Sequence, residues 1–153
     1  MLEVKDNKLI IDDTVKDLKD INLINGKNNN VYFSDNMLER IKIYPYSVEK
    51  VHLALLNAGL NDFWLVNNTI INLNNIERVY IKYYQNAGVS VVESSKANAA
   101  TCFVNIVCKN GRTESISFSS DKEAEKFYHL IDDKIADMKM YKHMEENNEK
   151  FRI

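Results

Sequence analysis

The sequence predicts an α+β fold, in which short antiparallel strands surround one inserted short helix and are followed by a long C-terminal amphipathic helix. Short apolar runs, separated by turn signals that contain Asn or Gly, extend through most of the chain. From residue 120 onward the apolar residues instead recur every three or four positions, which is the spacing of a helix. Runs of strands followed by a helix are typical of the α+β class.

The N-terminal part is predicted to contain several short strands. Residues 2–11 are typical of a hairpin, because two apolar runs flank the polar turn KDNK. The pattern at 14–25 fits a strand or a helix, and both remain open. The sequence GKNNN at 26–30 predicts a loop, and residues 31–33 predict a short strand.

A capped turn and a short helix are predicted next. Ser34 can cap a turn that continues through Met37, Leu38 and Ile41 and stops at Pro45. Ser47 is a suitable N-cap for a helix that includes Val48, Val51, Leu55 and Leu56. Gly59 followed by the apolar Leu60 is typical of a helix C-terminus. The inserted helix is therefore expected at 47–58.

Strands dominate the following stretch and are expected at 62–66, 69–73, 76–84 and 88–93. Asn67-Asn68 can make a tight turn between the first two of them. Asn110-Gly111 is a strong hairpin signal, because a type I′ turn needs positive φ at both central residues. That turn would pair Phe103 with Phe118. It would place on one core-facing side of the hairpin Phe103, Val107, Ile116 and Phe118.

The C-terminal helix is predicted to begin at Ser120, where Glu123 completes a capping box. One apolar stripe follows, made of Ala124, Phe127, Tyr128, Ile131, Ile135 and Met138. Residues 145–150 (EENNEK) have no apolar face, so residues 145–153 are expected to form a flexible tail. We expect the strands and helix of residues 1–60 to belong to the same domain as the sheet and helix of residues 61–144.

Three segments resemble the small pleckstrin-homology-like domains of bacteria and phages. They are INLNNIERVYI at 71–81, FVNIVCKNGRTESISF and the helix DKEAEKFYHLI. The resemblance covers roughly residues 61–144. It implies a curved antiparallel sheet, or partial barrel, closed by one C-terminal helix. It also implies a role in binding proteins or building scaffolds, although a fold alone does not identify a ligand.

Composition limits the cellular setting. Lys outnumbers Arg 16 to 4, and the 20 Asn and 15 Ile residues also have AT-rich codons, which indicates a low-GC bacterium or one of its phages. The two cysteines, Cys102 and Cys108, lie about 20 Å apart on one predicted strand, too far for a disulfide. Free thiols and the absence of an N-terminal apolar run predict a cytoplasmic protein.

Patterns that carry catalysis or bind cofactors are missing from the sequence. The four glycines are far apart, so no phosphate-binding loop is predicted. Two cysteines on one strand do not begin a structural zinc site. No nucleophile with a neighbouring base can be identified among the serines. We therefore expect no catalytic residues, no metal, no cofactor and no enzymatic activity.

Alternation along ERVYIKYY places Arg78, Tyr80, Lys82 and Tyr84 on one face of a strand. Two cations that alternate with two tyrosines make a surface that can stack a base and pair with a phosphate, so these residues are candidates for binding a nucleotide-type ligand. A solvent-facing sheet surface with cross-strand aromatic pairs explains the same pattern and is favoured.

The end of the long helix is the candidate protein interface, because Met138, Met140, Tyr141 and Met144 exceed what one sheet needs to cover it. The leading hypothesis is a non-enzymatic interaction module that binds itself, as a homo-oligomer, or another protein. The alternative is a binder of a small nucleotide-type signal, as in a phage anti-defence protein. Single-stranded nucleic-acid binding ranks third, and membrane binding is not expected, because the net charge is −2.

Overall fold

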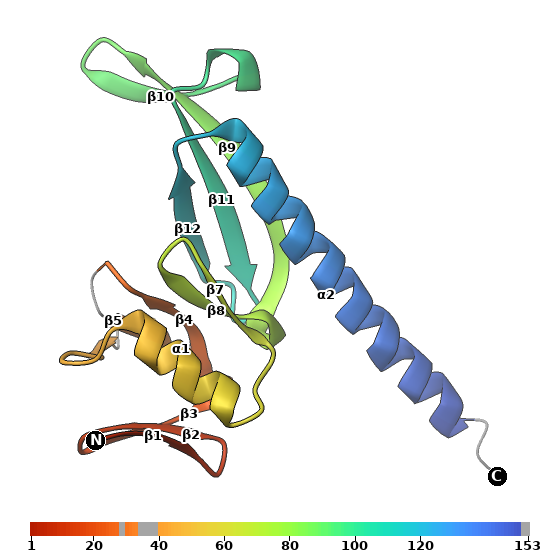
Figure 1. Ribbon diagram of the computed structural model, residues 1–153. Coiled ribbons are helices and arrows are strands. Elements are labelled where there is room, and N and C mark those ends of the chain that lie inside the picture. Colours follow the sequence, from red (N-terminus) through yellow and green to blue (C-terminus); the bar gives the residue numbers. More distant parts are fainter. Residues whose placement is uncertain (28–29, 34–39, 151–153) are drawn as a thin grey trace. The chain divides into compact units, whose positions relative to one another are not determined.

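A computed structural model describes residues 1–27, 30–33 and 40–150, and the chain divides into two compact units (Figure 1). Unit 1 contains residues 1–76 together with 108–112, and unit 2 contains the remainder. The turn predicted from Ser34 falls mainly on residues 34–39, outside the described part. Unit 1 has two sheets and unit 2 has one, and each unit has its own helix.

A three-stranded antiparallel meander opens unit 1 and consists of β1 (Leu2–Lys5), β2 (Lys8–Ile11) and β3 (Thr14–Asp17). Asp6 and Asn7 adopt positive φ angles of 53° and 61° between the first two strands, so the predicted hairpin is confirmed. Residues 14–25, for which strand and helix both remained open, form two strands with a short turn between them. The chain continues from β3 through a 3-10 turn (Leu18–Asp20) into β4 (Ile21–Asn25).

The second sheet of unit 1 has the order β6-β5-β4-β8-β7 and is antiparallel throughout. Its other members are β5 (Asn30–Phe33), β6 (Arg40–Lys42), β7 (Phe63–Val66) and β8 (Thr69–Asn72). Asn67 and Asn68 have φ angles of 49° and 60°, as the predicted two-residue turn requires. The hairpin β7–β8 therefore joins β4, which is about 45 residues earlier in the chain, rather than the strands that follow it.

Helix α1 (Val48–Asn57) covers this sheet and begins and ends as predicted. The Ser47 hydroxyl oxygen accepts a hydrogen bond from the backbone N–H of Lys50, at 3.3 Å. At the C-terminus Gly59 has φ 81°, and Leu60 N donates to Leu55 O at 3.1 Å, which is the 6→1 bond of a Schellman motif. The core packed between α1 and the two sheets is Leu9, Ile11, Leu18, Ile21, Ile24, Ile43, Val48, Val51, Leu55, Phe63 and Ile70.

Unit 2 is a four-stranded antiparallel sheet with one long helix. Its order is β10-β9-β11-β12, with β9 (Ile76–Ala87), β10 (Ser90–Ser94), β11 (Thr101–Cys108) and β12 (Thr113–Phe118). Short 3-10 turns precede β9 (Leu73–Asn75) and connect β10 to β11 (Lys96–Asn98).

The predicted register of the β11–β12 hairpin is wrong by one residue. Phe118 pairs with Cys102, and Phe103 pairs with Ser117. The turn has three residues instead of two: Gly111 N donates to Cys108 O at 2.9 Å, and only Gly111, at φ 91°, has a positive φ. A slip of one residue exchanges the two faces of a strand. The buried residues of β11 on the helix side are consequently not Phe103 and Val107 but Cys102, Val104, Ile106 and Cys108, whereas Ile116 and Phe118 of β12 are buried as predicted.

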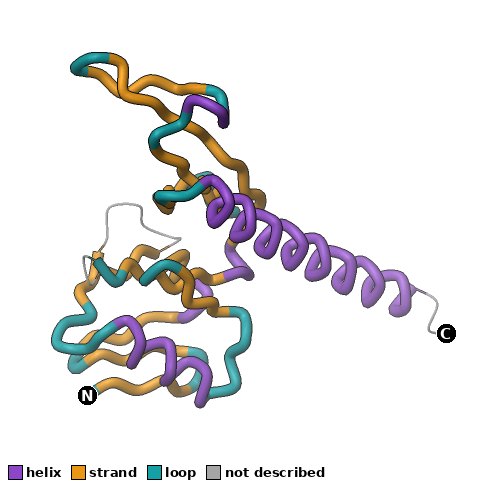
Figure 2. The backbone as a smooth tube through the Cα atoms, turned by 45° about the horizontal axis from the view of Figure 1, so that its top comes forward, coloured by secondary structure: helices purple, strands orange, loops and turns teal. Residues whose placement is uncertain are grey.

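Helix α2 (Asp121–Lys150) starts at the predicted cap, where Ala124 N donates to Ser120 O at 3.1 Å. Its buried stripe is Ala124, Phe127, Ile131 and Ile135. The helix continues to Lys150 and is uninterrupted (Figure 2), so residues 145–150, expected to be frayed, are helical. No helix within the described ranges is long and apolar enough to cross a membrane.

The α+β class, the antiparallel pairing, the inserted helix and the long terminal helix are confirmed. The expected single curved sheet or partial barrel is not what the strands form. They make three open sheets of three, five and four strands.

Candidate functional site

The predicted ligand ladder on β9 lies on the sheet face opposite α2. Two odd-numbered residues of β9 contact that helix through their side chains: the Tyr83 hydroxyl donates a hydrogen bond to Glu125 Oε1 at 3.3 Å, and Glu77 Oε1 lies 3.5 Å from Lys139 Nζ. Because side chains alternate along a strand, the even-numbered residues from Arg78 to Tyr84 point the other way. The four candidate residues therefore share the face of β9 that points away from α2.

Each member of the ladder has a partner within unit 2. The guanidinium carbon of Arg78 lies 5.2 Å from the centroid of the Tyr80 ring. Lys82 Nζ is 3.9 Å from a carboxylate oxygen of Glu93, which sits on β10 opposite Tyr84.

Tyr84 completes the ladder with an edge-on ring contact to Phe103, at a centroid distance of 5.4 Å and an interplanar angle of 84°. An anionic ligand on this face would have to compete with Glu93 for the charge of Lys82, and a base would have to replace Arg78 on the Tyr80 ring. These contacts favour the interpretation as a self-paired sheet surface.

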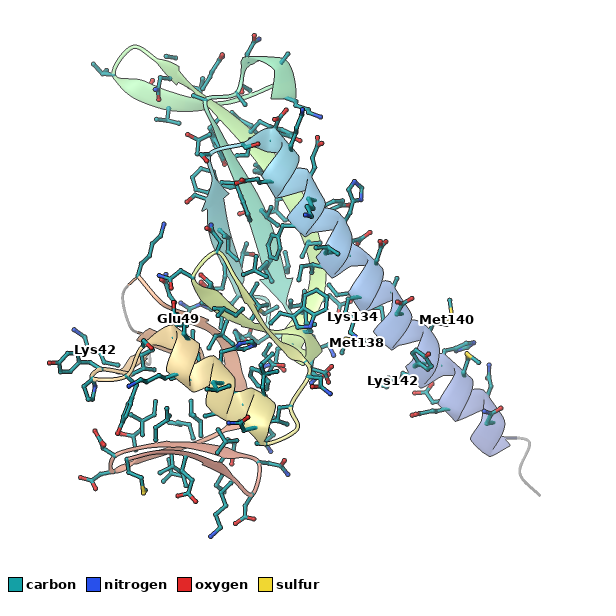
Figure 3. All side chains as sticks on the ribbon, in the orientation of Figure 1. Lys42, Glu49, Lys134, Met138, Met140 and Lys142 are labelled. Atoms are coloured by element: carbon teal, nitrogen blue, oxygen red, sulfur yellow. The ribbon has the colours of Figure 1, made fainter. Side chains whose placement is uncertain are left out.

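The predicted interface on α2 is divided between two sides of the helix. Met138 is half-buried and ends the stripe that faces the sheet. Figure 3 shows it on the same side as Lys134 and Lys142, with Met140 on the opposite side. Met140, Tyr141 and Met144 are 61%, 69% and 52% exposed, and we call these three residues the α2 apolar patch.

The α2 apolar patch lies on a part of the helix that has passed the end of its sheet. Contacts at Tyr83 with Glu125 and at Glu77 with Lys139 mark the length over which β9 and α2 run together. The fourteen residue steps from Glu125 to Lys139 rise about 21 Å along α2, and the six from Tyr83 to Glu77 rise about 20 Å along β9, so the two elements are matched in length over this stretch. Residues 140–150 then continue for about 16 Å beyond the point where β9 begins.

A polar cluster joins the turn before β11 to the start of α2. Lys96 forms a close ion pair with Glu125, which also accepts the hydrogen bond from Tyr83. Lys96 lowers the pKa of Glu125, and burial together with Glu125 raises the pKa of Tyr83. Burial also raises the pKa of the Cys102 thiol. The ion pair of Lys96 and the hydrogen bond of Tyr83 both end on Glu125, so this cluster is suited to fixing the loop on the helix.

Two hollows that the sequence did not indicate are lined by described residues of unit 1. The larger, about 430 Å³, is lined by Asn7, Asp17, Leu18, Lys19, Leu60, Phe63, Asn74 and Asn75. Two of its side-chain amides donate to protein groups: that of Asn75 to Lys19 O and Ile21 O, and that of Asn74 to Asp62. These two amides therefore brace the hollow.

The smaller hollow, about 350 Å³, is a groove between α1 and β7, and we call it the β7 groove. Its lining is His52, Leu56, Asn61, Phe63, Trp64, Leu65 and Val66. All four residues of β7 line it, although they alternate between the two faces of the sheet. A groove that touches both sets runs along the edge of the strand. No sequence signal could have found it, because the positions of α1 and β7 at the sheet edge arise from tertiary packing.

Comparison of the chain with models of protein families, with curated proteins and with solved structures found no match. Within the ranges that the structure describes, no three His, Cys, Asp or Glu side chains come together as a metal site.

Proposed function

We propose that this chain is a non-enzymatic protein-interaction module that self-associates through the α2 apolar patch. The carrying observation is the exposure of Met140, Tyr141 and Met144 on a helical segment that extends past its sheet. Methionine and tyrosine are the residue types that adaptable protein interfaces favour.

The pattern of residues along α2 also supports burial of the α2 apolar patch by a partner. The stripe that faces the sheet ends at Met138, and the positions that continue its side of the helix are the charged residues Lys142 and Glu145. The α2 apolar patch lies on a different side of the helix from this stripe. A terminal segment of eleven residues gains little helical stability from propensity alone, so tertiary or quaternary packing normally supports such a length.

A second copy is the occupant that we favour for the α2 apolar patch. Two identical helix ends that cross about a twofold axis present the same three side chains to each other, which is the self-complementary arrangement of most homodimers. The unbranched Met140 and Met144 can repack around the ring of Tyr141 at such a crossing. The rest of unit 2 would remain free for another partner.

Sedimentation equilibrium tests this proposal over a range from low to high micromolar protein. The wild type should show a reversible increase in mean mass with concentration. The double variant Tyr141→Ser/Met144→Ser should remain monomeric over the same range. Lys142→Ser is the matched control, since it lies in the same helical turn on the other side and should associate like the wild type. A monomeric wild type at every concentration would remove the proposal.

Binding of a small nucleotide-type ligand by Arg78, Tyr80, Lys82 and Tyr84 is the alternative. The exposed guanidinium of Arg78, already stacked on an aromatic ring, is the feature that supports it. Mass spectrometry of small molecules carried by the protein from cell extract tests it. The single variants Arg78→Ala and Tyr80→Ala should each release any such molecule. Single-stranded nucleic acid on the same face ranks lower, and its signature would be an affinity that falls steeply with salt.

The pleckstrin-homology-like assignment is kept as a proposal for unit 2 alone. One antiparallel sheet with a single C-terminal helix across it supports the assignment. The expected origin in a low-GC bacterium or phage and the cytoplasmic location rest on codon bias and on the two buried free thiols.

A further inference from the structure

The strand β7 is an edge strand with an unusual composition. It ends the order β6-β5-β4-β8-β7, and no other described strand pairs with its outer side. Edge strands normally carry charges or proline, which prevent pairing with a foreign strand. The sequence of β7 is Phe-Trp-Leu-Val, with neither. Every other described edge strand has at least one charged residue, and these strands are β1, β3, β6, β10 and β12.

The direction of the free backbone groups follows from the turn. Val66 pairs with Thr69 across a two-residue turn, so this pair exchanges both hydrogen bonds with β8. Alternation then directs the backbone of Trp64 toward β8 and the backbones of Phe63 and Leu65 away from it. The hydrogen bond from Leu73 N to Asp62 O, at 2.9 Å, agrees with this alternation, because Asp62 is the next position whose backbone should point toward the β8 side.

One contact shows that an outward backbone group of β7 points into the β7 groove. The Nε2 atom of His52 on α1 is 3.0 Å from the carbonyl oxygen of Phe63, so this carbonyl points into the β7 groove. A carbonyl oxygen has two lone pairs and can accept a second bond from an incoming N–H. The N–H of Leu65 and the N–H of Phe63 belong to the same outward set.

The lining of the β7 groove specifies a neutral, partly apolar occupant. Leu56 and His52 of α1 form one wall, and β7 forms the other. None of the seven lining residues is Asp, Glu, Lys or Arg. A charged side chain entering the groove would lose hydration and gain no opposite charge.

We propose that the β7 groove binds a short extended peptide segment of a partner protein, which adds as a sixth strand beside β7. Backbone bonds to Phe63 and Leu65 would hold the peptide, and an uncharged apolar side chain would enter beside Leu56. A second copy of this chain is a poorer occupant. Four residues of strand bury much less than the roughly 1,000 Å² that a stable dimer requires, whereas a peptide segment that binds transiently needs less area.

Trp64 provides the measurement, because it lines the groove and is the only tryptophan in the chain. The full chain is titrated with end-capped peptides of seven residues that alternate threonine with valine, leucine or phenylalanine, up to about 1 mM. At least one peptide should shift the emission of Trp64 saturably. A peptide of the same length with lysine in place of the apolar residues should not.

Two pairs of variants locate the site. Leu56→Lys puts a charge into the groove wall and should abolish binding. Leu53 is also exposed on α1, at 56% against 42% for Leu56, but is outside the lining, so Leu53→Lys should bind within about twofold of the wild type. Leu65→Pro removes an outward N–H and should weaken binding about tenfold. Val15→Pro removes the outward N–H of another edge strand, β3, and should leave the affinity unchanged.

Three outcomes overturn the proposal: no peptide shifts the emission, Leu56→Lys binds as well as Leu53→Lys, or the emission changes with protein concentration alone. The last would indicate a second copy in the groove. The pair on α1 still decides the question if Leu65→Pro does not fold. Sedimentation of the α2 variants is independent of all these measurements, so failure of the groove and failure of self-association are distinguishable.

Discussion

Truncation of Phe127 tests the packing on which the description of unit 2 depends. Its side chain is 4% exposed, and its ring lies 5.3 Å from that of Phe118 at an interplanar angle of 35°. Phe127→Ala removes this ring and leaves a cavity next to Phe118, so it should lower the free energy of unfolding by about 3–5 kcal/mol. That is a large part of the ~5–15 kcal/mol typical of a domain.

Leu130→Ala is the matched control, because Leu130 is on the same helix, is apolar and is 51% exposed. Its effect should stay within about 0.5 kcal/mol. Urea unfolding followed by far-UV circular dichroism is the assay, since α2 contributes 30 helical residues and α1 only 10.

A double-mutant cycle of Phe127 with Phe118 should give a coupling energy of about 0.5–1.5 kcal/mol, as expected for a close aromatic pair. Equal and small effects at Phe127 and Leu130 would show that α2 does not pack on its sheet. The buried stripe would then be wrong, and with it the side of the helix assigned to the α2 apolar patch.

Two further predictions concern titratable groups of the chain. Cys102 and Cys108 are 4% and 3% exposed, and burial raises the pKa of the Cys102 thiol, so an aromatic disulfide reagent at pH 8 should label both slowly and label them rapidly only in urea. Lys96 holds the pKa of Glu125 below its ordinary value of 4.5, so their pairing stabilises the fold above that pH and the contribution is lost as the pH falls through the lowered pKa. The urea midpoints of the wild type and Glu125→Gln should therefore converge as the pH is lowered from 7 to below 4; a constant difference would contradict this pairing.

Two hairpins show what local sequence can and cannot predict. Asn67 and Asn68 both adopt positive φ, and the two-residue turn predicted from them is confirmed. Asn110-Gly111 carries a stronger signal, yet only Gly111 has positive φ. The N–H of Lys109 donates to the carbonyl of Asn75 at 2.8 Å, 34 residues away. A contact over that distance is invisible to local turn rules, and it accompanies the longer turn and the changed register.

Helices were easier to predict than sheets for the same reason. The ends of α1 and the start of α2 depend on caps within five residues of one another, so the sequence contains the whole signal. The partition into three sheets depends on which distant strands meet. The place of β7 and β8 beside β4 is set by pairs such as Leu23 with Ile71, about 50 residues apart. The four residues of the β9 ladder could be placed on one face by alternation, but their partners Glu93 and Phe103 could not.

The proposed surfaces share one property: a residue choice that the fold alone does not explain. An edge strand without charge or proline risks aggregation, and three large apolar side chains on a solvated helix surface gain nothing from their own sheet. In a sequence that agrees with its structure at the helix caps and at the Asn67-Asn68 turn, such departures are where function is expected. The β9 ladder does not depart in this way, because its cations and rings are paired within unit 2. This contrast ranks the β7 groove and the α2 apolar patch above the ladder as binding surfaces.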